Sequence, residues 1–263
     1  MKDREPAAGG SQDLDRAAEW IHRGARVVAF TGAGISVESG IPPFRGEEGL
    51  WRRVDPSFIE IDRFCAEPLA CWQMIRDIFY EHFGHARPNA AHEALARLER
   101  AGFLRAIVTQ NIDHLHQDAG SRSVVEFHGQ SKQLRCLSCD RTVPAEAPLL
   151  EKLPPRCACG GLFKPDFVFF GEPIPAKAAE SAFALAETAD LMLVVGTSGE
   201  VMPACQIPLA AAARGIRIIE VNPVPSAFTP RITNLFLQGK AGPVLSALAD
   251  RVLAMSGSDG EPA

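Results

Sequence analysis

The chain has 263 residues, of which 46% are hydrophobic, and a formal net charge of −5. This length and composition suffice for one large core or two modest ones, and the charge excludes a general attraction to nucleic acid or anionic membranes. No apolar stretch approaches the roughly 20 residues that a membrane span needs, and the polar N-terminus lacks the apolar segment of a signal peptide. We therefore expect a cytoplasmic protein with neither a membrane nor a nucleic acid as a partner.

Apolar strands alternate with helical patterns along most of the chain. Strands are predicted over residues 27–30, 105–108, 191–195 and 216–221, and a strand-like run also covers 124–127. Helices are predicted over residues 13–23, 68–83, 90–101, 176–187, 203–214 and 243–255. This order predicts an α/β fold: a Rossmann-like parallel sheet with helices on both faces, and ligands at the carboxyl ends of the strands.

The composition marks out a smaller unit and two tails. Residues 1–12 and 256–263 are small, polar and rich in glycine, which is typical of disordered tails. Residues 131–165 contain two pairs of cysteines, and we expect them to form a small inserted zinc-binding domain. The larger domain would then comprise residues 13–130 and 166–255, including an irregular and helical segment at about 35–90.

The first predicted strand ends in a glycine turn, Gly32-Ala33-Gly34, that is typical of phosphate-binding loops. The dinucleotide fingerprint of dehydrogenases has a further glycine where this chain has Val37. Residues 39–46 follow, with two prolines that lack backbone donors and prevent a continuing helix. The turn therefore indicates nucleotide binding, but in a geometry that differs from that of a dehydrogenase.

Four of the seven cysteines lie in two closely spaced pairs. Two residues separate Cys136 from Cys139, and one residue separates Cys157 from Cys159. Two such pairs can bring four thiolates to one tetrahedral Zn²⁺ ion, which leaves no open position for catalysis. We predict a structural zinc site, and the alternative is a set of free thiols.

Polar residues follow the second predicted strand, where the ligands of a parallel sheet bind. The run reads Thr-Gln-Asn-Ile-Asp and contains Asn111 and Asp113. An aspartate can accept a hydrogen bond from a carboxamide, and an asparagine can bind a ribose hydroxyl. The alternative is structural, because Asn111 or Asp113 can cap the helix that begins beyond them. His114 and His116 are expected on the surface of that helix.

His128 follows a strand-like run and precedes Gly129, which lets a ligand approach closely. A histidine with an ordinary pKa near 6.5 suits the role of a general base. Two alternatives remain open for His128. It can be a buried histidine with a structural role, or an additional zinc ligand, although four cysteines already complete a tetrahedral site.

Several short motifs occur in a fixed order along residues 27–244. They are Gly32-Ala33-Gly34-Ile35-Ser36, Ser39-Gly40-Ile41-Pro42, Phe44-Arg45-Gly46, Thr109-Gln110-Asn111-Ile112-Asp113, His128-Gly129, the paired cysteines and Gly196-Thr197-Ser198. In this combination the chain resembles the sirtuins, NAD-dependent protein deacylases, and among them the bacterial type. The resemblance implies that NAD and an acyl-lysine protein or peptide enter a cleft between a large Rossmann-like domain and a small zinc-binding domain. We also expect a monomer.

The resemblance implies roles for individual residues. The glycine turn would bind the pyrophosphate of NAD, and residues 39–46 would form a mobile flap over the nicotinamide ribose. The residues placed around NAD are Gly32, Ala33, Gly34, Phe44, Arg45, Gln110, Asn111, Ile112, Asp113, Gly196, Thr197, Ser198, Asn222, Pro223, Lys240 and Ala241. The catalytic residues would be His128, which deprotonates a ribose hydroxyl, and Asn111. The products would be lysine, nicotinamide and O-acyl-ADP-ribose.

Residues 164–172 resemble the strand that pairs with an extended substrate peptide in this family. The expected substrate-binding residues are Val168, Phe169, Phe170 and Gly171. Val168 and Phe170 share one face by strand alternation and would line the tunnel for the acyl-lysine. The alternative is that these apolar side chains belong to the core.

The chain lacks a pair of residues that indicates which acyl groups a sirtuin removes. Sirtuins that prefer succinyl- or malonyl-lysine carry a Tyr-x-x-Arg pair in the helix after the flap. In this chain the only tyrosine, Tyr80, is followed three residues later by Phe83. A buried carboxylate would therefore be uncompensated, so we expect neutral acyl groups, with acetyl first and longer aliphatic chains after it.

Two other functions use the same residues. The site could serve a mono-ADP-ribosyltransferase or NAD glycohydrolase, which cleaves NAD towards a different acceptor. The chain could also be a non-catalytic NAD-sensing module. Against the latter, the sequence contains Asn111, Asp113 and His128, which chemistry requires and binding alone does not.

Overall fold

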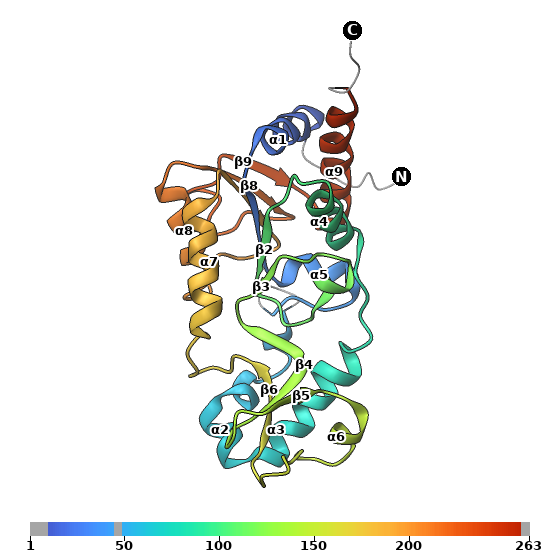
Figure 1. Ribbon diagram of the computed structural model, residues 1–263, viewed down its shortest axis with the longest axis vertical. Coiled ribbons are helices and arrows are strands. Elements are labelled where there is room, and N and C mark those ends of the chain that lie inside the picture. The colour runs from blue at the N-terminus through green and yellow to red at the C-terminus, as the bar shows by residue number, and fades with distance from the viewer. Residues whose placement is uncertain (1–9, 45–48, 259–263) are drawn as a thin grey trace.

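The computed structural model describes residues 10–44 and 49–258, with side chains up to Met255. Within these residues the molecule consists of two lobes stacked along its long axis (Figure 1). The larger lobe, in the upper part of Figure 1, contains a six-stranded sheet, and the smaller lobe below it contains a three-stranded sheet. Arg45 of the predicted flap lies outside the described residues.

The sheet of the larger lobe is parallel at every strand pair in the described residues. Its strands are arranged in the order β3 (Val124–Glu126), β2 (Ala106–Thr109), β1 (Val27–Thr31), β7 (Leu191–Val195), β8 (Arg217–Asn222) and β9 (Leu235–Gln238). Every residue of β1 and β7 is buried, which is why these strands read as continuous apolar runs. From β1 the chain builds outward to β3 and then returns to β7 on the other side of β1. Ligands of open α/β sheets bind at such a reversal.

Helices cover both faces of this sheet (Figure 1). One face carries α1 (Ser11–Arg23), α4 (Ala90–Arg100) and α9 (Ala241–Ser258), and the other carries α7 (Ala176–Thr188) and α8 (Gln206–Ala213). The buried residues of α1 are Leu14, Ala17, Ala18 and Ile21, the spacing of one face of a helix. This arrangement confirms the predicted α/β fold with helices on both faces.

The smaller lobe is built from two segments that lie far apart in the sequence. The later segment forms an antiparallel sheet, in which β4 (Gly129–Cys136) lies between β5 (Thr142–Pro144) and β6 (Phe163–Phe167), and the short helix α6 (Ala147–Glu151). The earlier segment forms the 3-10 helices η2 (Leu50–Arg52) and η3 (Pro56–Ile59), the helices α2 (Ile61–Ala66) and α3 (Pro68–Ile75), and the π-helix η4 (Arg76–His82).

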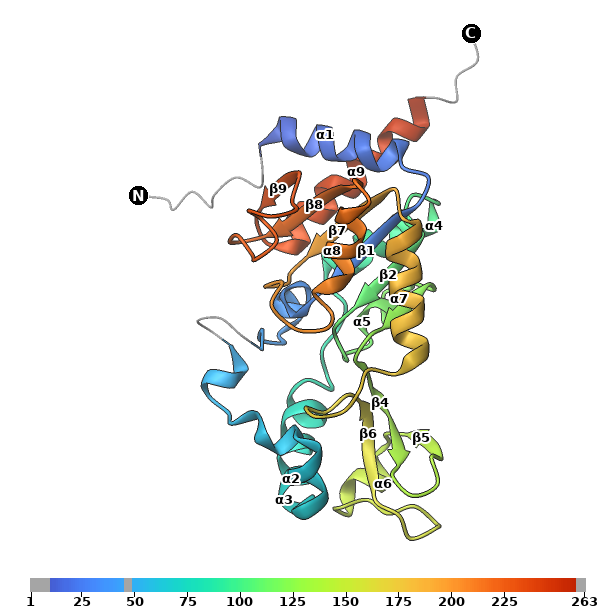
Figure 2. The ribbon, with the colours of Figure 1, turned by 90° about the vertical axis from the view of Figure 1, so that its left-hand side faces the viewer.

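These two segments share one apolar cluster, which is separate from the two clusters of the larger lobe. Trp72 of α3 is fully buried in this cluster and donates a hydrogen bond from its ring nitrogen to the backbone oxygen of Phe163, at 2.9 Å. Figure 2 shows α2 and α3 beside β4 and β6. The helical segment was expected within the larger domain, but its buried side chains pack against the cysteine-bearing strands.

Some boundaries differ from the predictions. Helix α1 begins at Ser11, so the predicted tail of residues 1–12 is too long, and α9 continues to Ser258. The remainder of both predicted tails, residues 1–9 and 259–263, lies outside the described residues. Strand β9 was not predicted, because its run covers only four residues. Among the described residues, no helix is both long and apolar enough to cross a membrane.

Candidate active site

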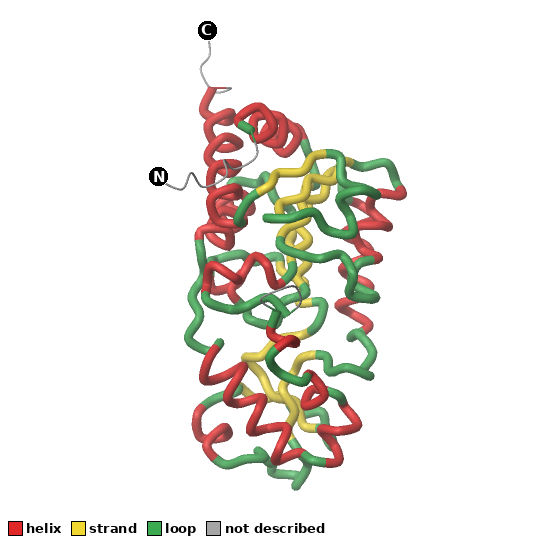
Figure 3. Tube along the Cα trace, turned by 180° about the vertical axis from the view of Figure 1, so that it is seen from behind, coloured by secondary structure: helices red, strands yellow, loops and turns green. Residues whose placement is uncertain are grey.

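Three loops meet at the carboxyl edge of the large sheet, beside the reversal between β1 and β7. Gly34 donates its backbone N–H to the oxygen of Gly196 at 2.8 Å, and Gln110 Nε2 donates to Thr197 Oγ1 at 3.0 Å. A Cβ atom on Gly34 would lie 2.6 Å from the Cα atom of Gly196, so the absence of a side chain permits this approach. Figure 3 shows loops, in green, between the strands of the larger and the smaller lobe. The predicted residues Gly32, Ala33, Gly34, Gln110, Gly196 and Thr197 are therefore neighbours in space.

The residues expected on the adenosine side lie farther along the same edge. Asn222 donates from Nδ2 to the backbone oxygen of Thr197 at 3.1 Å and to Glu220 Oε1 at 3.0 Å. The Nδ2 atom of Asn222 thus already has two acceptors within the protein, whereas its side-chain oxygen, Oδ1, has no partner among the described residues. Ser198, Pro223 and Lys240 are exposed, whereas Ala241 is buried at the start of α9.

A cavity of about 450 Å³ lies between the two lobes. Ala33, Ser36, Phe44, Asn111, Ile112 and Asp113 form its wall on the side of the glycine turn and the flap. The opposite wall comes from η4 and the small lobe, and it includes Arg76, Phe79, Tyr80, Glu81, Phe83, Ser131, Lys132, Leu150 and Glu151. Five of the predicted cofactor-binding residues thus line a single cavity, and the adenosine-side residues lie outside it.

The hydroxyl of Ser36 holds the side chains of Asn111 and Asp113 in the cavity wall. Ser36 Oγ donates to Asp113 Oδ2 at 2.7 Å and accepts from Asn111 Nδ2 at 3.0 Å. The other carboxylate oxygen of Asp113 accepts the backbone N–H of Leu115 at 3.0 Å, at the start of α5 (Leu115–Asp118). Asp113 therefore lies in the cavity wall and also accepts the first N–H group of α5, although the N-cap position itself is occupied by His114.

Two buried histidines lie behind this network. His92 Nε2 lies 3.5 Å from Ser36 Oγ, His116 Nε2 lies 2.9 Å from Thr31 Oγ1, and the two rings are 4.9 Å apart. Burial lowers the pKa of His92 to about 4 and that of His116 well below its ordinary value, so both rings are neutral at physiological pH. The prediction that His116 lies on the surface is wrong, because α5 directs this side chain towards β1. The sequence does carry a signal for His92, which completes a capping box with Asn89 at the start of α4.

The ring of His128 is oriented by a backbone carbonyl. His128 Nδ1 lies 2.9 Å from the oxygen of Gln110. Because a carbonyl only accepts hydrogen bonds, Nδ1 carries the proton and Nε2 is the basic nitrogen. Burial lowers the pKa of His128 below its ordinary value, although the hydrogen bond to Gln110 acts in the opposite direction. His128 is therefore a neutral histidine with a free basic nitrogen at neutral pH, which is the state that a general base needs.

The residues after β6 alternate between the core and the surface. Phe167 and Phe169 are buried in the cluster of the small lobe, whereas Val168 is partly buried and Phe170 is 45% exposed. The side chain of Phe169 therefore faces the core, which differs from the expectation that it contacts the substrate. Among the described residues, the carbonyl of Val168 and the N–H of Gly171 have no hydrogen-bond partner. They leave a short edge to which an extended peptide can pair.

The described part of the flap, up to Phe44, is joined to the residues that follow it at 50–51. Leu50 and Trp51 donate their backbone N–H groups to the oxygens of Pro43 and Phe44, at 2.8 and 3.1 Å. The ring of Phe44 stacks on Trp51 with the ring centroids 5.2 Å apart. These contacts hold Phe44 in the cavity wall, next to the position of Arg45 in the sequence.

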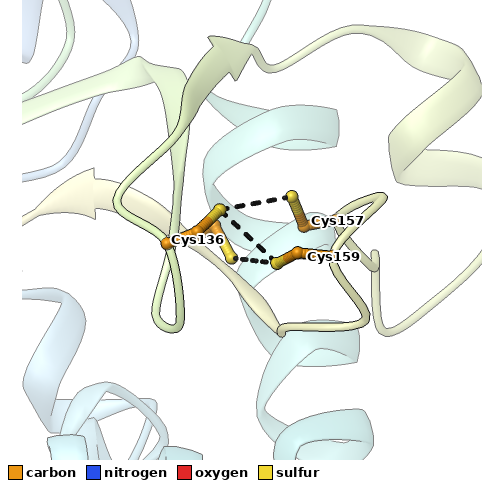
Figure 4. Close-up of side chains that lie close together, drawn as sticks. Cys136, Cys157 and Cys159 are labelled. Atoms are coloured by element: carbon orange, nitrogen blue, oxygen red, sulfur yellow. Dashed lines mark hydrogen bonds between the residues drawn. The ribbon is translucent and has the colours of Figure 1, made fainter.

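The four cysteines predicted to bind zinc form one cluster (Figure 4). Their Sγ atoms all lie within 4.8 Å of one another, with 3.6 Å between Cys136 and Cys159 and 3.7 Å between Cys139 and Cys157. Two sulfur atoms that each lie about 2.3 Å from a tetrahedral zinc ion are about 3.8 Å apart. A Cβ atom on Gly161 would lie 2.6 Å from Cys136 Sγ, so glycine keeps this corner open. The donor set and its spacing fit a structural Zn²⁺ ion.

The fold and the site define a nucleotide-binding α/β protein with a metal-binding lobe. The model of the Sir2 family matches residues 32–203. NAD-dependent protein deacylase 2 of Pyrobaculum aerophilum is 45% identical over 240 residues, which are 89% of this chain and 94% of that protein. The NAD-dependent protein deacylase of Thermococcus kodakarensis is 45% identical over 247 residues, which are 91% and 95% of the two chains. This chain belongs to the Sir2 family. Both organisms are archaea, so these relatives lend no support to the expected bacterial type.

Solved structures of the family match the whole fold. A Sir2 homologue in complex with NAD matches with a TM-score of 0.86 and 39% identity, over 96% of this chain and 97% of that one. Sir2 in complex with a p53 peptide and NAD⁺ matches with a TM-score of 0.82 and 34% identity, over 93% and 99%.

Proposed function

We propose that this protein is an NAD-dependent protein-lysine deacylase, which transfers an acyl group from lysine to ADP-ribose and releases nicotinamide. The observation that carries the proposal is the state of His128. Its ring is neutral, Gln110 fixes its tautomer, and the same loop continues into Asn111 and Asp113 in the cavity. A module that only binds NAD has no need of a basic nitrogen held in this way.

The residues of the site divide the work between binding and proton transfer. When bound, NAD supplies the ribose to which the acyl group is transferred. Asn111 and Asp113 present an amide and a carboxylate that suit a ribose hydroxyl and the nicotinamide carboxamide. Nε2 of His128 accepts the proton of a ribose hydroxyl, and Phe44 in the cavity wall excludes water from the reacting groups.

The substrate is an acyl-lysine in an extended segment of a protein. The unpaired carbonyl of Val168 and the unpaired N–H of Gly171 support this proposal, since two backbone groups three residues apart can pair with a peptide of any sequence. The exposed ring of Phe170 and the side chain of Val168 lie on the face of this edge that is directed away from the core.

The charges around the cavity favour a neutral acyl group. Two cations, Arg76 and Lys132, and three carboxylates, those of Glu81, Asp113 and Glu151, line the cavity, so the sum is −1. Both cations already have carboxylate partners. Arg76 Nε lies 3.1 Å from Glu81 Oε1, and Lys132 Nζ lies 3.6 Å from an oxygen of Asp118. Among the described residues that line the cavity, no cation lacks a carboxylate partner for a succinyl or malonyl group, so we propose acetyl and aliphatic acyl groups.

The cell compartment and the oligomeric state complete the proposal. None of the seven cysteines forms a disulfide, as expected in a reducing cytoplasm. We propose a cytoplasmic monomer that acts without nucleic acid or membrane partners. Light scattering after size-exclusion chromatography would test the oligomeric state.

Mass spectrometry of an acetyl-lysine peptide, incubated with the protein with and without NAD, tests the function. We expect loss of the acetyl group only with NAD, together with nicotinamide and O-acetyl-ADP-ribose, and no such loss with His128→Ala. Release of nicotinamide from a peptide that stays acetylated would favour ADP-ribosyl transfer or hydrolysis of NAD instead. No product from any of several acyl peptides would favour the NAD-sensing module.

A further inference from the structure

A buried ion pair lies beneath the proposed peptide-binding edge. The side chain of Lys164 is only 6% exposed, and its Nζ atom lies 3.0 Å from Glu172 Oε2. The same ammonium donates to the backbone oxygens of Pro165, at 3.0 Å, and Phe167, at 2.6 Å. These three acceptors match the three protons of an ammonium group. The buried charge is therefore fully satisfied.

Glu172 holds the other end of the same segment. Its Oε2 atom accepts the backbone N–H of Phe169 at 2.7 Å, and its own N–H donates to the oxygen of Phe169 at 3.0 Å. Lys164 Nζ also lies 4.2 Å from the centroid of the Phe169 ring, within range of a cation–π interaction. Residues 165–172 thus fold around one charged centre, and Val168 and Phe170 project from its outer face.

A contribution to stability does not account for the buried pair of Lys164 and Glu172. A buried ion pair adds little stability compared with apolar residues of the same volume, but removal of one partner leaves an uncompensated charge. Neither Lys164 nor Glu172 lines the cavity that contains Asn111 and Asp113. The pair contacts the segment that presents the free backbone groups of Val168 and Gly171, and it contacts this segment at three backbone atoms.

We propose that Lys164 and Glu172 are positioning residues for the acyl-lysine peptide, which set the shape of residues 165–172 and thereby the affinity for the peptide rather than for NAD. The inference rests on the proposed deacylase function. It predicts that the two substrates respond differently when the pair is broken, which a general loss of stability would not produce.

The test compares Lys164→Met and Glu172→Gln with two matched controls. Lys164→Arg retains a cation with several donors. Arg135→Met removes the β4 partner of Asp166, a residue that lies on β6 like Lys164; the Arg135–Asp166 ion pair, at 2.8 Å, is more exposed than that of Lys164. Calorimetry would measure the binding of an acetyl-lysine peptide and of ADP-ribose, and steady-state kinetics would give KM and kcat for both substrates.

We expect Lys164→Met and Glu172→Gln to weaken peptide binding and raise the KM for the peptide by about tenfold, the effect of losing one hydrogen bond to a charged group. In both variants we expect little change in the affinity for ADP-ribose, in the KM for NAD and in the kcat at saturating peptide. The two controls, Lys164→Arg and Arg135→Met, should retain all of these values and the KM for the peptide. Unchanged peptide affinity, or parallel losses of peptide and ADP-ribose affinity in both variants, would overturn the inference. If the unmodified protein neither binds nor deacylates the peptide, the proposed function fails and the inference with it, whereas active protein with unaffected variants contradicts the inference alone.

Discussion

The Nδ1 atom of His128 and the backbone oxygen of Gln110 are 2.9 Å apart, which ties the proposed base to the loop that lines the cavity. Gln110 in turn donates to Thr197, so the loops after β2 and β7 and the ring of His128 are connected by two hydrogen bonds. The basic nitrogen is therefore placed by the sheet itself.

The pH dependence of the reaction should reflect the burial of His128. Because the neutral ring is the active form and burial lowers its pKa, the acid-side decline of kcat/KM should have its midpoint below pH 6.5, the ordinary pKa of a histidine. His128→Ala should reduce deacylation by about 10²- to 10⁴-fold. The measurements are the pH profile of nicotinamide release and the binding of ADP-ribose, which the variant should retain. A midpoint above pH 6.5 would contradict this assignment.

Loss of the metal should destabilise the whole small lobe. Cys136 and Cys157 are buried in the same cluster as Trp72, so the apolar core of this lobe depends on the four thiolates being held together. We expect Cys139→Ser to abolish stoichiometric zinc and to lower the Tm by about 10 °C. Elemental analysis and thermal unfolding would check this. Cys65→Ser, at an exposed cysteine outside the cluster, is the control and should keep both values. A stable protein without zinc would refute the structural role.

The buried histidines should make the protein sensitive to acid. In the folded state the pKa of His92 is about 4, whereas an unfolded histidine has a pKa of about 6.5. The unfolded state then binds more protons between these values, so stability is full above pH 6.5 and falls as the pH drops towards 4, by about 3 kcal/mol for this ring. Urea unfolding at pH 7.5 and 4.5 would measure the difference. His92→Gln should show a smaller difference than the unmodified protein, and His85→Gln, at an exposed histidine, should show the same difference. Equal pH dependence in all three would contradict the prediction.

The acyl preference should respond to one added cation. Phe83 lines the cavity three residues after Tyr80, so Phe83→Arg creates the Tyr-x-x-Arg pair that the chain lacks. We expect the unmodified protein to deacetylate better than it desuccinylates, and Phe83→Arg to raise the ratio of desuccinylation to deacetylation by about tenfold, since a charged hydrogen bond contributes about that factor. Kinetics with matched acetyl and succinyl peptides would measure the ratio. Phe83→Met is the control for lost aromatic packing. Efficient desuccinylation by the unmodified protein would refute the expectation.

The sequence predicted the sheet best where strands are buried on both faces. The runs that became β1 and β7 are continuous and apolar, and their ends coincide with the glycine motifs of the site. The burial of His116 could not be predicted, because α5 spans only Leu115–Asp118 and is too short to show a periodicity. The place of the helical segment also could not be predicted. It depends on contacts such as that between Trp72 and Phe163, which lie 91 positions apart.

The shared core of the small lobe also bears on how this part of the molecule can be exchanged between relatives. Residues 50–83 and the segment from β4 to β6 are two halves of one folding unit, although the chain enters the lobe twice. A graft that carried the cysteine-bearing half alone would present the wrong surface to Phe64 and Trp72, which are fully buried against it. Both the cavity between the lobes and the proposed peptide-binding edge at Val168 and Gly171 lie against this unit. We therefore expect that substrate preference can be transferred to a relative only when both halves are exchanged together.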